Sequence, residues 1–354
     1  MGALKFIASK RKSFNGAGPT HLTTVDWSNS SHRSSVAACL VEGVYSREEE
    51  RQQCCHGGDG GGGALASSAW WESFGFQLNQ VLIDEKDNSI FGAVYELKPS
   101  SSQAQAQAQA QAGKPPKQVI AFRGTLIEKM SWFQDFRLDS DIIQNKLHKS
   151  NRVLVVGWQA VEAAVSKVGA ENVWLAGHSL GSSIALLVGR NMVKMGYHLE
   201  TYLFNPPFVS LISTLLLKKV PKLQEGIRLA HAGVKALMAA TMSIANKKKI
   251  VEDDEEFNLL LPWIPHLFIN SSDPICAKYL EHFKHTAAGE IGRLVGMNSV
   301  RCMLGNAIGK DCKPSHLIPS AYLTVNSNGS KREAHNLSQW WRPDLKVDHK
   351  LSQL

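Results

Sequence analysis

One pentapeptide of this chain has the residue types and spacing for nucleophilic catalysis: Gly177-His178-Ser179-Leu180-Gly181. It follows a run typical of a buried strand and precedes a run typical of a buried helix. In this context a G-x-S-x-G segment forms a sharp strand-to-helix turn that exposes the serine hydroxyl at the edge of a sheet. The glycines leave room for the turn, and the helix N-terminus favours negative charge beside the serine. The pattern predicts Ser179 as a nucleophile and His178 as a structural residue of the turn; the alternative is a glycine-rich turn without a catalytic role.

A second segment could stabilise the charge that develops when a nucleophile attacks a carbonyl group. Such an oxyanion needs two backbone N–H donors. We expect one from Leu180, the residue after the nucleophile, and the other from Thr125, at the end of Ala121-Phe122-Arg123-Gly124-Thr125. The alternative for this second segment is a turn that ends a strand and exposes Arg123.

In this order, the two segments resemble motifs of the class 3 lipases, the fungal-lipase-like branch of the α/β-hydrolases. Trp132 and Asp135, between them, fit the same pattern. Residues 18–27 and 334–341 are similar to a plant group of these proteins, whose members are often named GDSL esterase/lipase. The sequence has no Gly-Asp-Ser-(Leu/Ile) block near its N-terminus, so that label does not describe its chemistry. The resemblance spans residues 18–342 apart from two insertions, and implies an ester hydrolase that needs no cofactor or metal.

The chain order of that fold, nucleophile then acid then base, indicates where the acid should be. Asp273 stands in a turn directly after an apolar run typical of a strand, and the family has Asn-x-x-Asp-Pro or a close variant there. The acid would orient the imidazole and stabilise its charged form. Asp273 followed by Pro274 is also a pattern for the start of a helix, and both roles can coexist. Asp253 and Asp254, within a charged run, are the competing candidates.

His335 is the expected general base. It lies late in the chain, after a predicted strand at 321–325, in the stretch that resembles the family. The competing candidate is His316, which precedes that strand. The predicted triad is therefore Ser179, Asp273 and His335.

Alternating apolar patterns predict the elements that carry these residues. Strands are expected at 89–97, 117–122, 172–176, 200–204, 265–270 and 321–325, and helices at 152–168 and 182–195. This alternation predicts an α/β fold, an α/β-hydrolase with a mostly parallel central sheet and helices on both faces.

The predicted domain organisation is one α/β-hydrolase domain with insertions. It comprises an N-terminal tail (1–17), the hydrolase domain (18–342) with low-complexity insertions 56–64 and 101–116 and a helical cap 208–258, and a C-terminal tail (343–354). The second insertion falls in a hairpin connection, where added residues are tolerated. The apolar residues of 126–133 could form a lid or line an acyl site, and core packing explains them equally well.

Composition excludes several other classes of protein. The 354 residues are 44% apolar and 20% charged, which is ordinary for a globular chain. The net charge of +8 is dispersed without a nucleic-acid recognition motif, and the six cysteines have no metal-ligand spacing. Lysines and arginines among apolar residues of the cap would suit peripheral contact with an anionic lipid surface; a solvated helical face is the simpler interpretation. The oligomeric state is not indicated.

The N-terminus lacks the apolar core and cleavage site of a secretory signal, so we expect a cytoplasmic protein. An organelle transit peptide is the alternative, because the first acidic residue is Asp26 and basic residues and serines precede it. The expected function is cleavage of carboxylic esters, with lipid or small-ester substrates. A different acceptor would make the same residues an acyltransferase, and a catalytically silent lipid- or protein-binding protein is the competing hypothesis.

Overall fold

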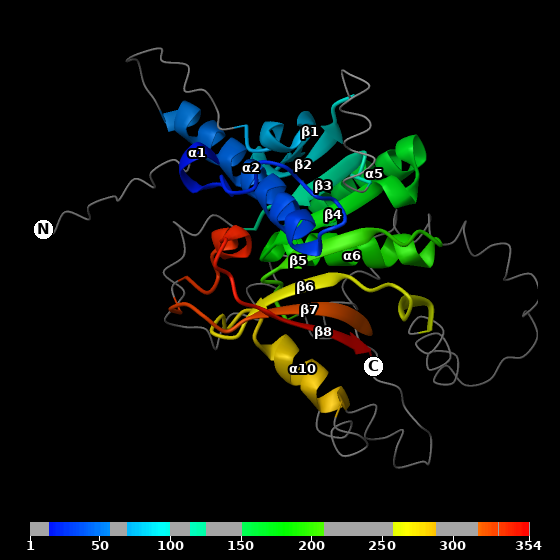
Figure 1. Ribbon diagram of the computed structural model, residues 1–354. Coiled ribbons are helices and arrows are strands. Elements are labelled where there is room, and N and C mark those ends of the chain that lie inside the picture. The colour runs from blue at the N-terminus through cyan, green and yellow to red at the C-terminus, as the bar shows by residue number, and fades with distance from the viewer. Residues whose placement is uncertain are drawn as a thin grey trace, which may run out of the picture.

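The computed structural model describes residues 14–56, 69–99, 114–124, 151–208, 258–287, 318–331 and 333–353. Eight strands form one sheet in which strand order follows the sequence (Figure 1). The strands are β1 (Phe76–Asp84), β2 (Ser89–Leu97), β3 (Gln118–Phe122), β4 (Val173–His178), β5 (Glu200–Phe204), β6 (His266–Asn270), β7 (Ser320–Asn326) and β8 (Asp348–Gln353). The helices are α1 (Phe14–Ala17), α2 (Ser30–His56), α5 (Asn151–Val168), α6 (Leu180–Lys194) and α10 (Lys278–Ala287), with 3₁₀ turns at Glu72–Phe74, Ala170–Asn172 and Leu337–Trp341.

The centre of the sheet is parallel, as predicted. Strands β3 to β7 pair in parallel, whereas β1, β2 and β3 pair antiparallel on one side and β8 pairs antiparallel with β7 on the other. The antiparallel pairing of β2 with β3 confirms that residues 101–116 fall in a hairpin connection. This is the sheet of an α/β-hydrolase fold, and each predicted strand is present.

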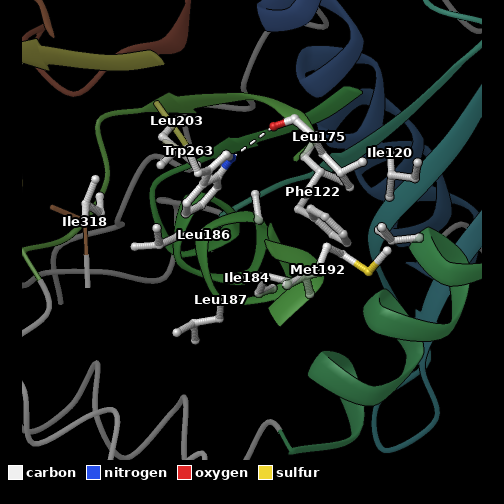
Figure 2. Close-up of a cluster of buried hydrophobic side chains, with 14 of the residues drawn as sticks. Ile120, Phe122, Leu175, Ile184, Leu186, Leu187, Met192, Leu203, Trp263 and Ile318 are labelled. Carbon is white, nitrogen blue, oxygen red and sulfur yellow. Dashed lines mark hydrogen bonds between the residues drawn. The ribbon is translucent and has the colours of Figure 1, made fainter. Parts of the chain in front are cut away.

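Connection geometry decides which helices cover which face of the sheet. Crossovers between parallel strands have one hand, so neighbouring strands in sequential order place their connecting helices on the same face. Helices α5, α6 and α10 accordingly share one hydrophobic core with the sheet. Figure 2 shows the part of this core in which strand residues such as Phe122 and Leu175 pack against Ile184 and Met192 of α6.

The opposite face is covered by elements from the two ends of the chain. Helix α2 and the 3₁₀ turn Leu337–Trp341 contribute to a second core, which includes Val36, Leu40 and Trp340. Because successive strand residues point to opposite faces, each central strand contributes to both cores, for example Leu175 to the first and Trp174 to the second. Helices therefore lie on both faces, as expected.

Both predicted tails are wrong in part. Residues 348–353, assigned to a C-terminal tail, form β8, which extends the sheet beyond β7. Residues 14–17, assigned to an N-terminal tail, form α1, and the Phe14 ring packs edge-on against Trp70 and Phe74. Helix α2 and strand β1 were not predicted.

Several predicted segments lie outside the described residues, namely the glycine tract, most of the alanine–glutamine insertion, the lid candidate and nearly all of the cap. The ranges concerned are 57–68, 100–113, 125–150, 209–257 and 288–317. Within the described ranges, no helix combines the length and apolar character needed to cross a membrane.

Candidate active site

Ser179 occupies the turn between β4 and α6, at the carboxyl edge of the parallel strands. It has φ 53° and ψ −125°, a positive-φ conformation that is uncommon outside glycine and costs on the order of 1–3 kcal/mol. Its backbone N–H donates to the carbonyl oxygen of Phe204, 2.9 Å away at the end of β5. Its side chain makes no capping hydrogen bond to α6 and is half-buried. The predicted strand-to-helix turn is confirmed, and the hydroxyl is not used by the helix that follows it.

Three glycines allow the backbone around Ser179 to pack closely. A Cβ atom on Gly177 would overlap the carbonyl oxygen of Gly181, and one on Gly181 would overlap the carbonyl oxygen of Phe122. A Cβ on Gly124 would lie 2.8 Å from the Cβ of Ser179. These positions require glycine for space, and Gly124 brings the end of β3 directly against the nucleophile turn.

Asp273 and His335 form a buried pair. Nδ1 of His335 donates to Oδ2 of Asp273 over 2.8 Å, and the two side chains are 4% and 0% exposed. Burial by itself would raise the pKa of Asp273, but hydrogen bonds from His335 and Asn205 and the charge of His335 outweigh it, so that pKa is lowered from its ordinary value. Oδ1 accepts from the backbone N–H of Ile275 at 3.0 Å, so Asp273 also caps the turn that precedes α10. Both functions considered for this residue are thus structurally compatible.

The loop that carries His335 is tied to the sheet by amide side chains. Nε2 of Gln339 lies 2.8 Å from the carbonyl oxygens of both Ala334 and Asn336. Its Oε1 accepts from the side-chain amides of Asn270 (2.7 Å) and Asn326 (2.8 Å), the last residues of β6 and β7. The position of the imidazole therefore depends on the ends of these strands.

His178 connects the nucleophile turn to the loop of His335. Burial, reinforced by the nearby charge of His335, lowers the pKa of His178 to about 3, so it is neutral at physiological pH. Its Nε2 lies 3.0 Å from the carbonyl oxygen of His335, which can only accept, so Nε2 carries the proton. Nδ1 must then accept from the hydroxyl of Tyr45 at 2.8 Å. The Tyr45 oxygen in turn accepts from the N–H of Gly124 at 2.7 Å. The structural role predicted for His178 takes the form of this chain of hydrogen bonds.

Arg123 is anchored instead of exposed, which corrects the alternative interpretation of its segment. Its side chain is 9% exposed and lies 3.7 Å from the carboxylate of Glu48, which is fully buried. It also donates to the carbonyl oxygens of Ile90 and Gly124. Glu48 is held further by a bidentate pair with Arg51. These contacts fix the end of β3 to α2, immediately before the expected oxyanion residue.

The structure describes some of the predicted site residues and not others. Leu180 opens α6, so its backbone N–H has no intrahelical acceptor. Thr125 lies outside the described residues, as do Trp132, Asp135, the acid candidates Asp253 and Asp254 and the base candidate His316. His335 is brought to the nucleophile turn, since its ring centroid is 4.9 Å from that of His178. Among the described residues no hydrogen bond joins Ser179 Oγ to His335 Nε2.

Sequence reasoning missed Tyr45, Glu48, Gln339 and Asn205. The first two lie on α2, which was not predicted, and no motif marked them. Asn205 directly follows β5 and precedes two prolines, a pattern that indicates the end of a strand and not a site residue.

A mostly parallel sheet with helices on both faces, a serine in a strained strand-to-helix turn and a buried Asp–His pair define the α/β-hydrolase class. A family model described as Lipase (class 3) matches residues 119–214. The chain is 38% identical over 356 residues to a GDSL esterase/lipase of Arabidopsis thaliana, At4g10955, and the similarity covers 98% of this chain and 99% of that protein. No solved structure matches significantly. The chain belongs to the class 3 lipase family, and this membership supports a lipase-like ester hydrolase.

Proposed function

We propose that this protein is a serine hydrolase of carboxylic esters, with lipid acyl esters as the substrate class. Ser179 is the nucleophile, His335 the general base and Asp273 the acid that orients it. The observation that carries the proposal is the buried Asp273–His335 pair at the sheet edge where Ser179 stands at φ 53°. Family membership and the esterase/lipase name of the Arabidopsis relative support the same reaction class.

The tautomer of His335 supports its role as the base. Its Nδ1 faces a carboxylate, which can only accept a hydrogen bond, so Nδ1 carries the proton and Nε2 has the free lone pair. In the reaction Nε2 takes the proton of Ser179 as Oγ attacks the acyl carbonyl carbon, and Asp273 stabilises the imidazolium that results. His178, the other imidazole nearby, stays neutral because its pKa is lowered to about 3, so it adds no competing positive charge.

The remaining steps use the helix N-terminus and water. The backbone N–H groups of Leu180 and Thr125 are the proposed donors to the oxyanion of the tetrahedral intermediate. The imidazolium then gives its proton to the leaving alcohol, and an acyl-enzyme ester remains on Ser179. Water, deprotonated by His335, attacks this ester, and the carboxylic acid leaves as Ser179 recovers its proton.

Hydrolysis of p-nitrophenyl esters of increasing acyl length, in wild-type protein and in Ser179→Ala, tests the proposal. Loss of the nucleophile is expected to lower the rate by several orders of magnitude. Ser183→Ala is the matched control, because Ser183 lies on α6 and its buried hydroxyl has no hydrogen-bond partner within the described part of the chain. We expect this control to retain wild-type activity, and the acyl-length optimum to separate an esterase from a lipase.

Two results would count against the hydrolase. One is equal hydrolysis by wild type and Ser179→Ala. The other is no hydrolysis by folded wild-type protein assayed with detergent or lipid, which would favour the non-catalytic binding protein.

A further inference from the structure

Asn205 makes contacts that join the acid to the loop of the base. It is the first residue after β5, and its side chain is fully buried. Its Nδ2 donates to Oδ2 of Asp273 over 2.7 Å and to the carbonyl oxygen of Ala334 over 2.9 Å. Ala334 directly precedes His335. One amide group therefore contacts both the carboxylate and the backbone that carries the imidazole.

The direction of this amide is fixed by the chemistry of its three nitrogen and oxygen partners. The indole Nε1 of Trp340 can only donate, and it lies 2.7 Å from Oδ1 of Asn205. The Asp273 carboxylate and the Ala334 carbonyl can only accept. Reversing the amide would place oxygen against two oxygens and an NH₂ group against an N–H, so all three hydrogen bonds would be lost. Trp340 thus keeps Nδ2 directed at Asp273.

We infer that Asn205 is a positioning residue for the proposed reaction, one that holds Asp273 in the orientation that His335 requires, with Trp340 fixing its amide. This inference rests on the proposed function. The same oxygen, Oδ2 of Asp273, accepts from both Nδ2 of Asn205 and Nδ1 of His335. Two donors on one oxygen restrict rotation of the carboxylate, and the imidazole follows the carboxylate.

The Asn205 amide can orient the Asp273 carboxylate without changing the charge of the site. The other group that contacts Oδ2 is the thiol of Cys276, 3.3 Å away, and burial raises the pKa of that thiol, so it is uncharged. His178, whose ring centroid lies 4.9 Å from that of His335, is neutral. Among these described contacts, Asp273 is therefore the group that balances the charge that forms on His335 during the reaction.

Asn205→Asp is the most direct test of this inference. Asn205 has φ 46°, and aspartate, like asparagine, tolerates this left-handed region, so the backbone can be kept. The substitution removes at least one of the two N–H donors of Nδ2, because a carboxyl group carries at most one proton, whereas the Asp273 carboxylate and the Ala334 carbonyl both only accept. We expect kcat to fall about 10- to 100-fold, the range found when outer hydrogen-bond partners of metal-site histidines and carboxylates are removed.

Two neighbouring tryptophans separate positioning from general damage to the core. Trp340→Phe keeps an aromatic ring against Phe204 and Phe268 but removes the N–H that orients Asn205. Trp341→Phe, at the next position, removes an indole N–H that donates to Ala17 at 2.8 Å, away from the pair. We expect Trp340→Phe to lower kcat several-fold, and Trp341→Phe to leave kcat within about twofold of wild type.

A measurement that needs no turnover distinguishes failure of this inference from failure of the proposed function. The far-downfield proton signal of His335 Nδ1–H in NMR spectra reports on its hydrogen bond to Asp273. It should shift or broaden in Asn205→Asp and Trp340→Phe and stay unchanged in Trp341→Phe. Wild-type kcat and an unchanged signal in Asn205→Asp would overturn the inference, as would equal losses of kcat in the two tryptophan variants. If wild-type protein hydrolyses no ester, the proposed function fails, and the NMR signal alone decides whether Asn205 positions the pair.

Discussion

Replacing Gly124 with alanine should separate the nucleophile turn from the end of β3. The new Cβ would lie 2.8 Å from the Cβ of Ser179, 2.8 Å from the hydroxyl of Tyr45 and 3.0 Å from the carbonyl oxygen of His178. Ordinary contacts of a Cβ begin at 3.4 Å, so the backbones must move apart by roughly 0.6 Å. Misplacement of reacting groups by 1 Å can cost about 100-fold in rate. We therefore expect kcat/KM to fall about 10- to 100-fold, equivalent to roughly 1.4–2.7 kcal/mol in the barrier.

The assay is ester hydrolysis together with thermal denaturation of the same preparations. Gly157→Ala provides the control, because it adds the same buried methyl group on α5, where its nearest neighbour is the ring of Phe122 at 3.2 Å, a ring that can adjust. This control should keep kcat/KM within a few-fold of wild type. The reasoning is refuted if Gly124→Ala is as active as wild type, or if Gly157→Ala loses activity to the same extent.

Two further predictions concern the hydrogen bonds around His178. Tyr45→Phe should lower stability by about 1–3 kcal/mol and reduce kcat, because it leaves the N–H of Gly124 and Nδ1 of His178 without partners. Tyr95→Phe is the control and should change neither stability nor kcat, since the buried Tyr95 hydroxyl has no partner among the described residues. The pKa of His178 is about 6.5 in the unfolded chain and about 3 in the folded protein. Between these pH values the unfolded chain binds a proton at His178 and the folded protein does not, so the free energy of unfolding should fall as pH decreases from about 6.5 toward about 3. The slope is about 1.4 kcal/mol per pH unit, and urea denaturation between pH 4 and 7 should show a smaller slope in His178→Gln; equal slopes would contradict the assignment.

The central strands were predictable because their signals are local. Runs such as 119–122 and 173–176 are apolar on both faces, and both faces are buried in the two cores. The nucleophile turn was equally predictable, because glycine and serine spacing determines its conformation within a few residues. Small differences arise where pairing continues beyond the apolar run: β4 extends to His178 because His178 still pairs with Phe204.

The elements that were missed have weak local signals. Strand β8 has the sequence Asp-His-Lys-Leu-Ser-Gln, of which only Ser352 is buried, and backbone pairing with β7 is what makes it a strand. Helix α2 buries every residue from 34 to 41, among them Val36 and Leu40, so its apolar residues show no helical period. Its packing against the sheet cannot be predicted from the sequence of the helix alone. Tyr45 and Glu48 could not have been assigned to the site without it.

The arrangement of the base depends on contacts between distant segments that no spacing rule predicts. Asn205, Asn270 and Asn326 stand at the carboxyl ends of three neighbouring parallel strands, where backbone pairing stops. The loop that follows the last of them has no ladder of its own, so its carbonyl groups need donors from side chains. Asn205 donates to this loop directly, and the other two asparagines bind Gln339, which donates to it. The sequence shows only three strands that each end near an asparagine. In the folded protein the amide groups of these asparagines hold the loop that carries His335. We therefore expect substitutions at these three positions to disturb the imidazole more than the sheet, because Asn270 and Asn326 form the last pair of the β6–β7 ladder and Asn205 lies just beyond β5.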